Sequence, residues 1–317
     1  MDKKRRYGLM GLVAVVVILA AIAVLAVYGG NSSTAGREAY NSSTGRQVQI
    51  VAAENFWGSL AQQLGGTHVN VTSIVTDPNA DPHEYESSSV NARAMAKAQI
   101  VIVNGAGYDD WALKLISANG NPNQTVLNVA DLLGIPNGTN PHLWYNPTYV
   151  NATVKQMYLD LVEMDPKDAG YYRQQYAALN ASLAQVDGRM SEIRQQFAGT
   201  KVASTESIFV YLANAIGLDL VSPPAFMDAV AEGVDPPAQS VVQFENQLES
   251  GNVSVLIYNE QTVNPLTQQM KQIAAQYNVT IVGVTETIQP PDVTFQTWMN
   301  AELLSLQNAL NAKTLGQ

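Results

Sequence analysis

The sequence predicts an α/β protein of two lobes, each with a mostly parallel β-sheet flanked by helices, joined by one long rigid helix. Short apolar runs alternate with helical stretches before residue 165 and again after residue 200. Such alternation indicates parallel sheets, because parallel strands need a crossover connection between them. Between these regions, apolar residues recur at three- and four-residue spacing over about 30 residues, which is long for a simple crossover helix.

The first lobe is predicted to span residues 47–165. Its expected strands are "QVQIVAA", "VNVTSIVT" and "IVIVNG", followed by "TVLNVADLL", a strand that runs into a loop holding "NPHLWYNP". Its expected helices are "NFWGSLAQQLGG", which ends at glycine, then "NARAMAKAQ" and "DWALKLISANG". Each strand has the length and β-branched composition of a buried strand, and each helix has apolar residues on one face.

A helical region starts near Tyr149, is interrupted at "DPKD", and restarts at Asp165 and Pro166. We assign residues 166–199 to the connecting helix and residues 200–317 to the second lobe. There we expect strands at "KVAST", "VSVLIYN" and "TIVGVT". The expected helices are "SIFVYLANAIGL", "AQSVVQFENQLESG", "LTQQMKQIAAQYN" and a closing helix from about Phe295. No fixed-period repeat is evident, and the two halves are expected to be alike only in class.

Residues 1–28 are predicted to be an N-terminal membrane anchor or an uncleaved signal. The basic "DKKRR" precedes an uncharged run from Tyr7 to Tyr28, which as a helix would span roughly 33 Å, about one bilayer core. A cleaved signal usually has a shorter apolar region, so a retained helix is favoured. The basic flank stays inside, which places the protein at the outer face of the cytoplasmic membrane, or secreted if the segment is cleaved. Residues 29–46 form a polar, flexible linker.

Composition narrows the possible partners. The 317 residues carry a net charge of −10 and include no cysteine. The acidic balance argues against nucleic acid as a partner and suits cationic ligands. The lack of cysteine excludes disulfides, thiolate metal sites, a cysteine nucleophile and a lipid anchor on cysteine. Glycine-rich phosphate loops, GxSxG and HExxH are also absent from the sequence, so we expect no enzyme activity.

The three histidines differ in setting. His83 lies in "DPNADPHEYE", where flanking prolines stiffen the chain, and it is a loop residue, a catalytic base or a metal ligand. His142, in "NPHLWYNP", again follows a strand between prolines, and it either packs under Trp144 or binds a ligand. His68, in the turn "GGTHVN", is expected to be an ordinary surface residue.

Two glutamates follow buried strands of the second lobe. Glu206 comes after "KVAST" and is either a helix N-terminal carboxylate or a site residue; Glu286 follows "TIVGVT" in the same way. An unpaired buried charge is costly, so each needs water, a cation or another partner. Ligands bind beyond the carboxyl ends of such strands. If both lobes face one cleft, His83, His142, Glu206 and Glu286 form a reasonable four-residue site for one divalent transition metal.

Other polar residues stand near these positions. Asp81, Glu84 and Glu86 would add electric field or hydrogen bonds to the ligands rather than bind the ion directly. Asn259 and Glu260, at the end of "VSVLIYN", are further candidates for the cleft.

The segments "AENFWGSLAQQLGG…VTSIVTDPNADPHEYE" and "NPHLWYNP" resemble the solute-binding proteins of zinc and manganese ABC importers, the cluster A-I family, which includes several streptococcal adhesins. The resemblance runs from about residue 47 to about residue 312. It implies that the histidine ligands are His83 and His142, that Glu206 is the third ligand, and that Glu286 is the fourth. The family commonly has aspartate there, one methylene shorter. "AFMDAVAEGVDPPAQSV" resembles the family's cleft-rim loop, and no ligand is assigned in it.

The resemblance implies capture of Mn²⁺ or Zn²⁺, with Fe²⁺ ranked below them, outside the membrane and delivery to the permease of an ABC importer. The expected partners are the ion, the permease and, through the N-terminal helix, the membrane; we expect a monomer. One alternative is a surface adhesin or interaction protein with a structural metal site. Another is a metal-dependent hydrolase, with Glu260 or Glu84 as the general base.

Overall fold

The structure is a computed structural model that describes residues 47–317 apart from 79–81, 83–84, 120 and 316–317. Residues 47–317 form one compact unit. The predicted membrane anchor, the linker and His83 lie outside the described residues, so these assignments stay predictions. Within the described part of the chain, no helix has both the length and the apolar character needed to cross a membrane.

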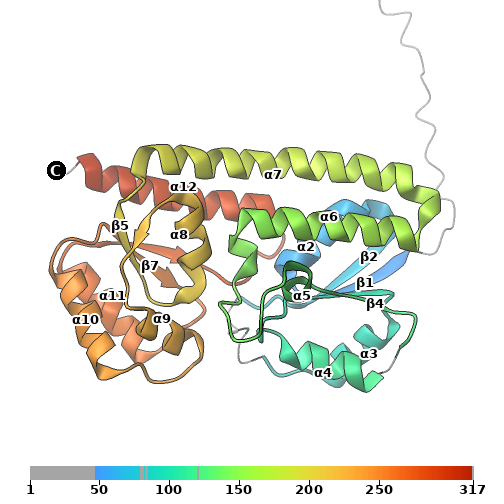
Figure 1. Ribbon diagram of the computed structural model, residues 1–317, viewed down its shortest axis with the longest axis horizontal. Helices are drawn as coiled ribbons and strands as arrows, with labels where there is room; N and C mark the ends of the chain where they lie inside the picture. The colour runs from blue at the N-terminus through green and yellow to red at the C-terminus, as the bar shows by residue number, and fades with distance from the viewer. Residues whose placement is uncertain (1–46, 79–81, 83–84, 120, 316–317) are drawn as a thin grey trace, which may run out of the picture. The chain divides into compact units, whose positions relative to one another are not determined.

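The first sheet contains four parallel strands in the order β2-β1-β3-β4 (Figure 1). The strands are β1 (Val48–Glu54), β2 (Val69–Val75), β3 (Ile100–Val103) and β4 (Thr125–Asn128). The connecting elements are α2 (Asn55–Gly65), η1 (Gly66–His68), α3 (Ser89–Lys97) and α4 (Asp110–Asn119). After β4 come α5 (Val129–Leu133), η3 (Leu143–Tyr145) and α6 (Pro147–Met164). Every residue of β3 is buried, as expected of a central strand covered on both faces.

The second sheet has the order β6-β5-β7-β8 and is also parallel throughout. Its strands are β5 (Lys201–Ser204), β6 (Asp219–Leu220), β7 (Val255–Asn259) and β8 (Thr280–Val284). The helices of this lobe are η5 (Ser207–Phe209), α8 (Val210–Ile216), α9 (Pro224–Ala231), α10 (Ala238–Glu249), α11 (Pro265–Gln276) and α12 (Phe295–Leu315). Both sheets therefore place their strands in the spatial order second, first, third, fourth. The halves share a topology, so the expectation that they are alike only in class was too weak.

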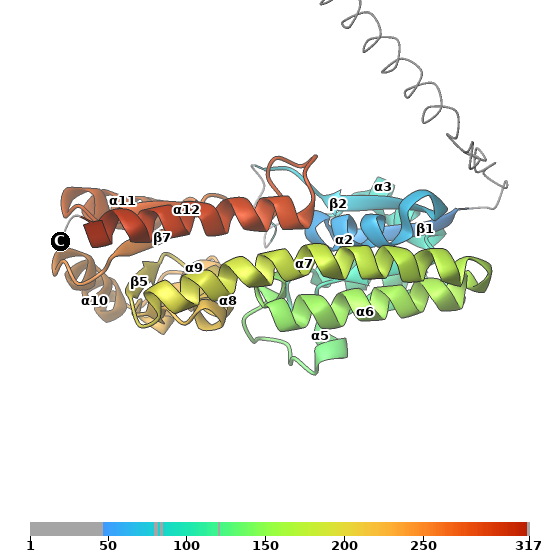
Figure 2. The same ribbon diagram turned by 90° about the horizontal axis from the view of Figure 1, so that it is seen from above.

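The two lobes share one large hydrophobic core beneath the connecting helix. This helix is α7 (Ala169–Phe197), 29 residues long, and η4 (Pro166–Asp168) precedes it. Figures 1 and 2 show α7 along both lobes, with α12 beside it over the second lobe and α2 and α6 beneath it on the first lobe. The shared core includes Trp57, Tyr172, Ile208 and Trp298. Separate cores lie beneath α3 and α4 and beneath α9, α10 and α11. The predicted architecture is thus confirmed.

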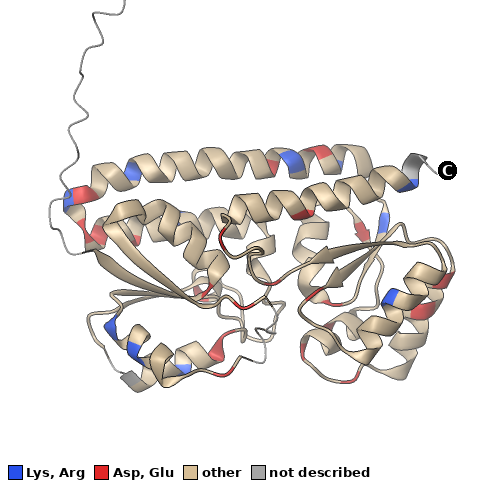
Figure 3. Cartoon of the chain, turned by 180° about the vertical axis from the view of Figure 1, so that it is seen from behind, with Lys and Arg blue, Asp and Glu red and all other residues tan. Residues whose placement is uncertain are grey.

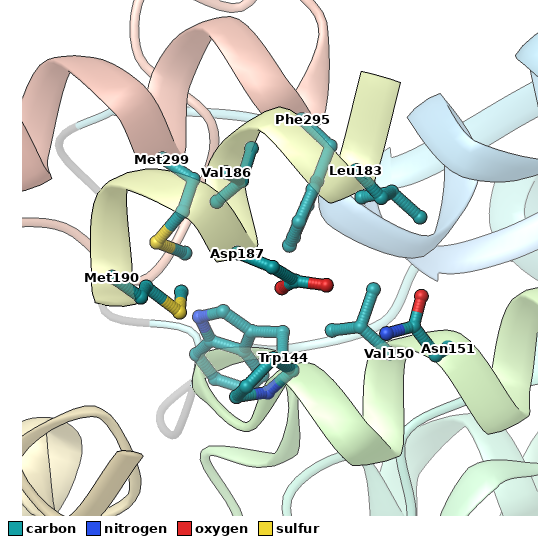
Figure 4. Close-up of a pocket in the computed structure, with 10 residues that line it drawn as sticks. Trp144, Val150, Asn151, Leu183, Val186, Asp187, Met190, Phe295 and Met299 are labelled. Atoms are coloured by element: carbon teal, nitrogen blue, oxygen red, sulfur yellow. The ribbon is translucent and has the colours of Figure 1, made fainter. Parts of the chain in front are cut away.

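A crevice between α6, α7 and α12 is part of this packing (Figure 4). Apolar side chains such as Trp144, Leu183, Met190 and Phe295 line it, together with Asp187. Its free volume is about 10 Å³, which is barely enough for one water molecule. The crevice is therefore a packing seam rather than a ligand site.

One local prediction was wrong. The segment after β4 does not run directly into a loop, because Asn128 caps α5 by accepting a hydrogen bond from the backbone N–H of Asp131. The segment that resembles a cleft-rim loop contains α9, which begins with Pro224 in its first turn, a position where proline suits a helix.

Candidate metal site between the lobes

His142 from the first lobe meets Glu206 and Glu286 from the second. The His142 Nε2 atom lies 3.4 Å from Glu206 Oε1 and 4.0 Å from Glu286 Oε2. One ligand atom from each residue falls within 4.8 Å of the others, and all three side chains are fully buried. The structure thus brings together three of the four residues predicted from the sequence, and the fourth, His83, lies outside the described residues.

His142 is held so that one particular nitrogen faces the glutamates. Its Nδ1 lies 2.8 Å from Asn140 Oδ1, and that oxygen also accepts the backbone N–H of His142 at 3.0 Å. The amide oxygen can only accept, so Nδ1 carries the proton and Nε2 of the neutral ring keeps its lone pair for a metal. The ring also packs edge-on against Trp144, with centroids 5.3 Å apart. The two interpretations of His142, packing and ligand binding, are therefore compatible.

Asn140 also connects the two lobes. Its side-chain amide donates to the backbone oxygen of Ser207 at 2.7 Å. Its backbone carbonyl accepts from the Tyr211 hydroxyl at 3.0 Å. Both partners belong to the second lobe and lie close to Glu206 in the sequence. Asn140 therefore couples the orientation of His142 to the position of the segment that bears Glu206.

Glu206 stands at a helix N-terminus, but its side chain does not cap the helix. It precedes η5, which has only three residues, and its side chain makes no capping hydrogen bond. Its backbone is extended, with φ −153° and ψ −176°, and its carbonyl accepts from the Ser204 hydroxyl at 2.7 Å. The helix N-terminal position of Glu206 therefore does not by itself account for its carboxylate, which makes no capping hydrogen bond there. The buried side chain is directed instead toward His142.

Glu286 is fixed by donors from both lobes. The Tyr108 hydroxyl donates to Oε2 at 2.6 Å, and the side-chain amide of Asn259 donates to Oε1 at 2.7 Å. The backbone N–H groups of Glu286 and Thr287 both donate to Gln261 Oε1, at 2.8 and 2.9 Å. The carboxylate is therefore oriented before any ion arrives. Sequence reasoning proposed Asn259 for the cleft but missed Tyr108 and Gln261.

The third strand of each sheet ends in a buried asparagine that supports the next ligand-bearing loop. Asn104, after β3, donates to the backbone oxygen of Pro141 at 2.8 Å, directly before His142. Asn259, at the end of β7, binds Glu286 itself. Both asparagines are fully buried. The shared strand order thus extends to the way in which each lobe holds its part of the site.

Replacing Tyr108 with phenylalanine should lower the affinity for Mn²⁺ or Zn²⁺ by roughly 10- to 100-fold, the usual cost of losing a partner of a ligand. The ring would keep its packing against Phe56 and Trp144, while Glu286 would lose the hydroxyl that holds Oε2. Calorimetry measures the affinity, and the electron paramagnetic resonance spectrum of bound Mn²⁺ reports a changed ligand geometry. Wild-type affinity together with an unchanged spectrum would show that Tyr108 only fills space.

Tyr108 is presented by a constrained turn. Gly105, Ala106 and Gly107 have φ values of 76°, 56° and 91°, and Ala106 is a non-glycine residue in the left-handed region. The Asp109 carboxylate holds this turn by accepting the backbone N–H groups of Asn104 at 2.6 Å and of Gly105 at 2.8 Å. The position of Tyr108 therefore depends on Asp109.

Asp109 shares a buried environment with Glu54. Burial raises the pKa of Asp109 from 3.8 to about 6. Burial also raises the pKa of Glu54 well above its ordinary value, and the charge of Asp109 raises it further. A side-chain hydrogen bond between the two raises the pKa of Glu54 and lowers that of Asp109, as expected when Glu54 is protonated and donates. A raised carboxyl pKa makes the folded state bind more protons than the unfolded state, so this pair destabilises the fold as pH rises.

Replacing Glu54 with glutamine should make the metal-free protein increasingly more stable than wild type as pH rises from 5 to 8. Glutamine mimics the protonated acid and can donate to Asp109, but it does not titrate. The wild-type fold loses stability above pH 4.5 as the unfolded chain releases the Glu54 proton and the folded chain keeps it. Urea unfolding in chelator at several pH values measures the difference. If the difference in the free energy of unfolding between the two proteins stayed constant from pH 5 to 8, Glu54 would not be protonated in the folded chain.

A cavity of about 440 Å³ adjoins the candidate site. Tyr108, Asn140 and Ser207 line it, and Asp228 and Glu232 lie along its α9 side. Seen from behind, the loops between the two sheets carry several acidic segments (Figure 3). An acidic approach of this kind favours the entry of a cation.

Two other acidic residues proposed near the site are exposed rather than buried with the cluster. Glu260 is exposed, and its carboxylate lies over Gly283; Glu86 is exposed as well. Asp81 and Glu84 lie outside the described residues. The proposed contributions of Glu86 and Glu260 to the site therefore stay predictions.

The chain has two lobes built on parallel sheets, and one long helix bridges them. A buried cluster of one imidazole and two carboxylates lies between the lobes. This arrangement is that of a two-lobed binding protein. The model of ZnuA, the periplasmic component A of zinc-uptake complexes, matches residues 50–309. The chain belongs to this family.

Similar proteins support this family assignment. The chain is 25% identical over 254 residues to the manganese-binding lipoprotein MntA of Halalkalibacterium halodurans, covering 78% of this chain and 80% of that protein. It is 24% identical over 269 residues to the iron-binding protein YfeA of Yersinia pestis, covering 81% and 85%. The names of these relatives attribute different metals to them.

Solved structures share the fold. The periplasmic zinc-binding protein TroA of Treponema pallidum superposes with a TM-score of 0.72 at 14% identity, covering 84% of this chain and 99% of that one. The laminin-binding protein of Streptococcus agalactiae, described as a bifunctional adhesin and metal transporter, gives a TM-score of 0.70 at 17% identity, covering 83% and 99%.

Proposed function

We propose that this chain captures a divalent transition metal outside the cytoplasmic membrane and delivers it to the permease of an ABC importer. His142, Glu206 and Glu286 bind the ion, and His83 supplies the fourth ligand. The observation that carries the proposal is the convergence of His142, Glu206 and Glu286 from two lobes on one buried point. Family membership and the metal-binding relatives support it.

The electrostatics of the cluster suit a dication. Two buried carboxylates carry a formal charge of −2 when ionised, and burial of such charge is costly without a counter-charge. The lone pair on His142 Nε2 and the oriented carboxylate of Glu286 are already directed at the same point. Tetrahedral zinc and six-coordinate manganese both accept imidazole and carboxylate donors.

The cargo is Mn²⁺ or Zn²⁺, with Fe²⁺ ranked below them. The two carboxylates favour a harder ion such as Mn²⁺, whereas the general affinity order of divalent ions places Zn²⁺ above Mn²⁺ at most sites. Relatives are named for manganese, iron and zinc. Binding in a purified sample and transport in a cell are therefore separate questions for this protein.

The alternatives have less support. A metal-dependent hydrolase needs an open coordination position and a nearby general base, but the cluster is fully buried and Glu260 is exposed elsewhere. A surface adhesin is not favoured, because the family model and the curated relatives are named for metal uptake or metal binding.

Uptake by cells tests the transport function. In cells whose own copy of the gene is deleted, the wild-type chain should restore uptake of radioactive manganese or zinc at limiting metal, whereas Glu206→Ala should leave uptake at the level of the deletion strain. Glu260→Gln is the matched control, since it removes a carboxylate outside the cluster, and should restore uptake fully. Normal uptake with Glu206→Ala would contradict the proposed role.

A further inference from the structure

His68 is not the ordinary surface residue that the sequence suggested. Its side chain is only 12% exposed. The ring packs against Tyr171, with centroids 4.2 Å apart, and edge-on against Tyr172 at 5.9 Å. These tyrosines lie in the first turn of α7, so the histidine is held at the corner where α6 meets α7.

Two aspartates of the same corner lie beside this ring. His68 Nδ1 is 2.8 Å from Asp168 Oδ2. Asp165, directly after α6, accepts a hydrogen bond from the Tyr172 hydroxyl at 3.1 Å. One ligand atom from each of His68, Asp165 and Asp168 lies within 4.8 Å of the others. The three residues come from two segments about one hundred residues apart in the sequence.

The corner also has unbalanced charge. Neither Asp165 nor Asp168 forms a salt bridge with any lysine or arginine in the described ranges, although Lys167 lies between them in the sequence. The carbonyl end of α6 favours a cation near Asp165, and the amide end of α7 opposes one near Asp168, so the helix ends roughly cancel. A cation held by both carboxylates would offset the remaining negative charge.

We propose that His68, Asp165 and Asp168 form a second, weaker site for a divalent transition metal. All three residues are partly buried, which leaves room for water molecules to complete the coordination and makes the site weaker than an enclosed one. An imidazole donor favours Zn²⁺ over Mn²⁺, and it disfavours Ca²⁺ and Mg²⁺, which take oxygen ligands.

This site is separate from the cleft. His142 precedes α6 and Asp165 follows it, so the 18 residues of α6 lie between the two positions, a rise of roughly 27 Å. The proposal therefore does not rest on the proposed function. Each site can be removed without touching residues of the other.

The test is calorimetric titration of the chain with Zn²⁺ after the cleft has been silenced by His83→Ala and Glu206→Ala. One weaker binding event should remain, and His68→Ala should reduce its affinity at least tenfold. Because that change also removes a ring that packs on Tyr171, Asp165→Asn serves as the conservative variant; it keeps the shape and an oxygen that can accept from Tyr172. Asp219→Asn, which alters an exposed aspartate elsewhere, should change nothing.

A spectroscopic readout locates the ion directly. The chain has three histidines, so the imidazole nitrogen signals of the silenced protein can be assigned by replacing His68 and His142 in turn. Zn²⁺ should shift the His68 signals, and excess Mg²⁺ should not prevent the shift. No remaining event in the silenced protein, or an event that His68→Ala and Asp165→Asn leave unchanged, would overturn the proposal. Wild-type protein that shows only the weaker event would contradict the proposed function of the cleft and leave this site standing.

Discussion

Replacing His142 with alanine is expected to lower the affinity of the chain for Mn²⁺ and Zn²⁺ by about 100-fold or more. Loss of a group that merely supports a metal ligand usually costs 10- to 100-fold, so loss of a ligand should reach or exceed the upper end of that range. The variant also leaves Glu206 and Glu286 buried without the imidazole between them. Calorimetry on metal-stripped protein measures the affinity.

The matched control for His142→Ala is Asn140→Ala. It removes the acceptor that fixes the Nδ1 proton and the hydrogen bond to Ser207, but keeps the imidazole itself. Its loss of affinity should be smaller than that of His142→Ala. Equal affinity of the His142→Ala variant and wild type would remove His142 from the site.

Replacing Gly105 with alanine is expected to destabilise the fold by about 3 kcal/mol, from a left-handed backbone and from overpacking. Gly105 has φ 76°, and an added Cβ would collide with the Asn128 side chain and lie 2.8 Å from Ala130 Cβ. Asn128 caps α5, and Gly105 begins the turn that presents Tyr108. The change should therefore weaken metal binding as well as the fold. Urea unfolding and calorimetry measure the two effects.

Gly107→Ala is the control for Gly105→Ala. Gly107 also has a positive φ, 91°, but nothing lies within 4 Å of the position that its Cβ would occupy. Its cost should be limited to backbone strain, about 1–2 kcal/mol. If the two variants were destabilised equally, the collision with the α5 cap would play no part.

Two of the proposed ligands could be predicted because each directly follows a strand. Short apolar strands are recognisable in this sequence, and polar residues directly after parallel strands gather at one edge of a sheet. That rule selected Glu206 and Glu286 from a sequence with 27 acidic residues. His142 is separated from β4 by α5 and a loop, and its proline-flanked setting indicated it instead. The rule applies without knowledge of how the two lobes face each other.

The supporting residues could not be predicted in this way. Tyr108 and Glu286 are 178 residues apart, and the hydrogen bond between them depends on how the two lobes are packed. The packing of His68 against Tyr171 is equally non-local. A buried polar side chain and an exposed one look the same in a sequence when the partner is distant. The shared strand order was missed because topology is set by which strands pair, not by the residues of one strand.

The most direct test of the site is a crystal structure of residues 47–317 loaded with one equivalent of Mn²⁺ or Zn²⁺, with the ion located by anomalous scattering. We expect one strong peak about 2.0–2.3 Å from His142 Nε2 and from carboxylate oxygens of Glu206 and Glu286, with the His83 imidazole completing the four protein ligands. A peak elsewhere, with no ion bound to these residues, would contradict it.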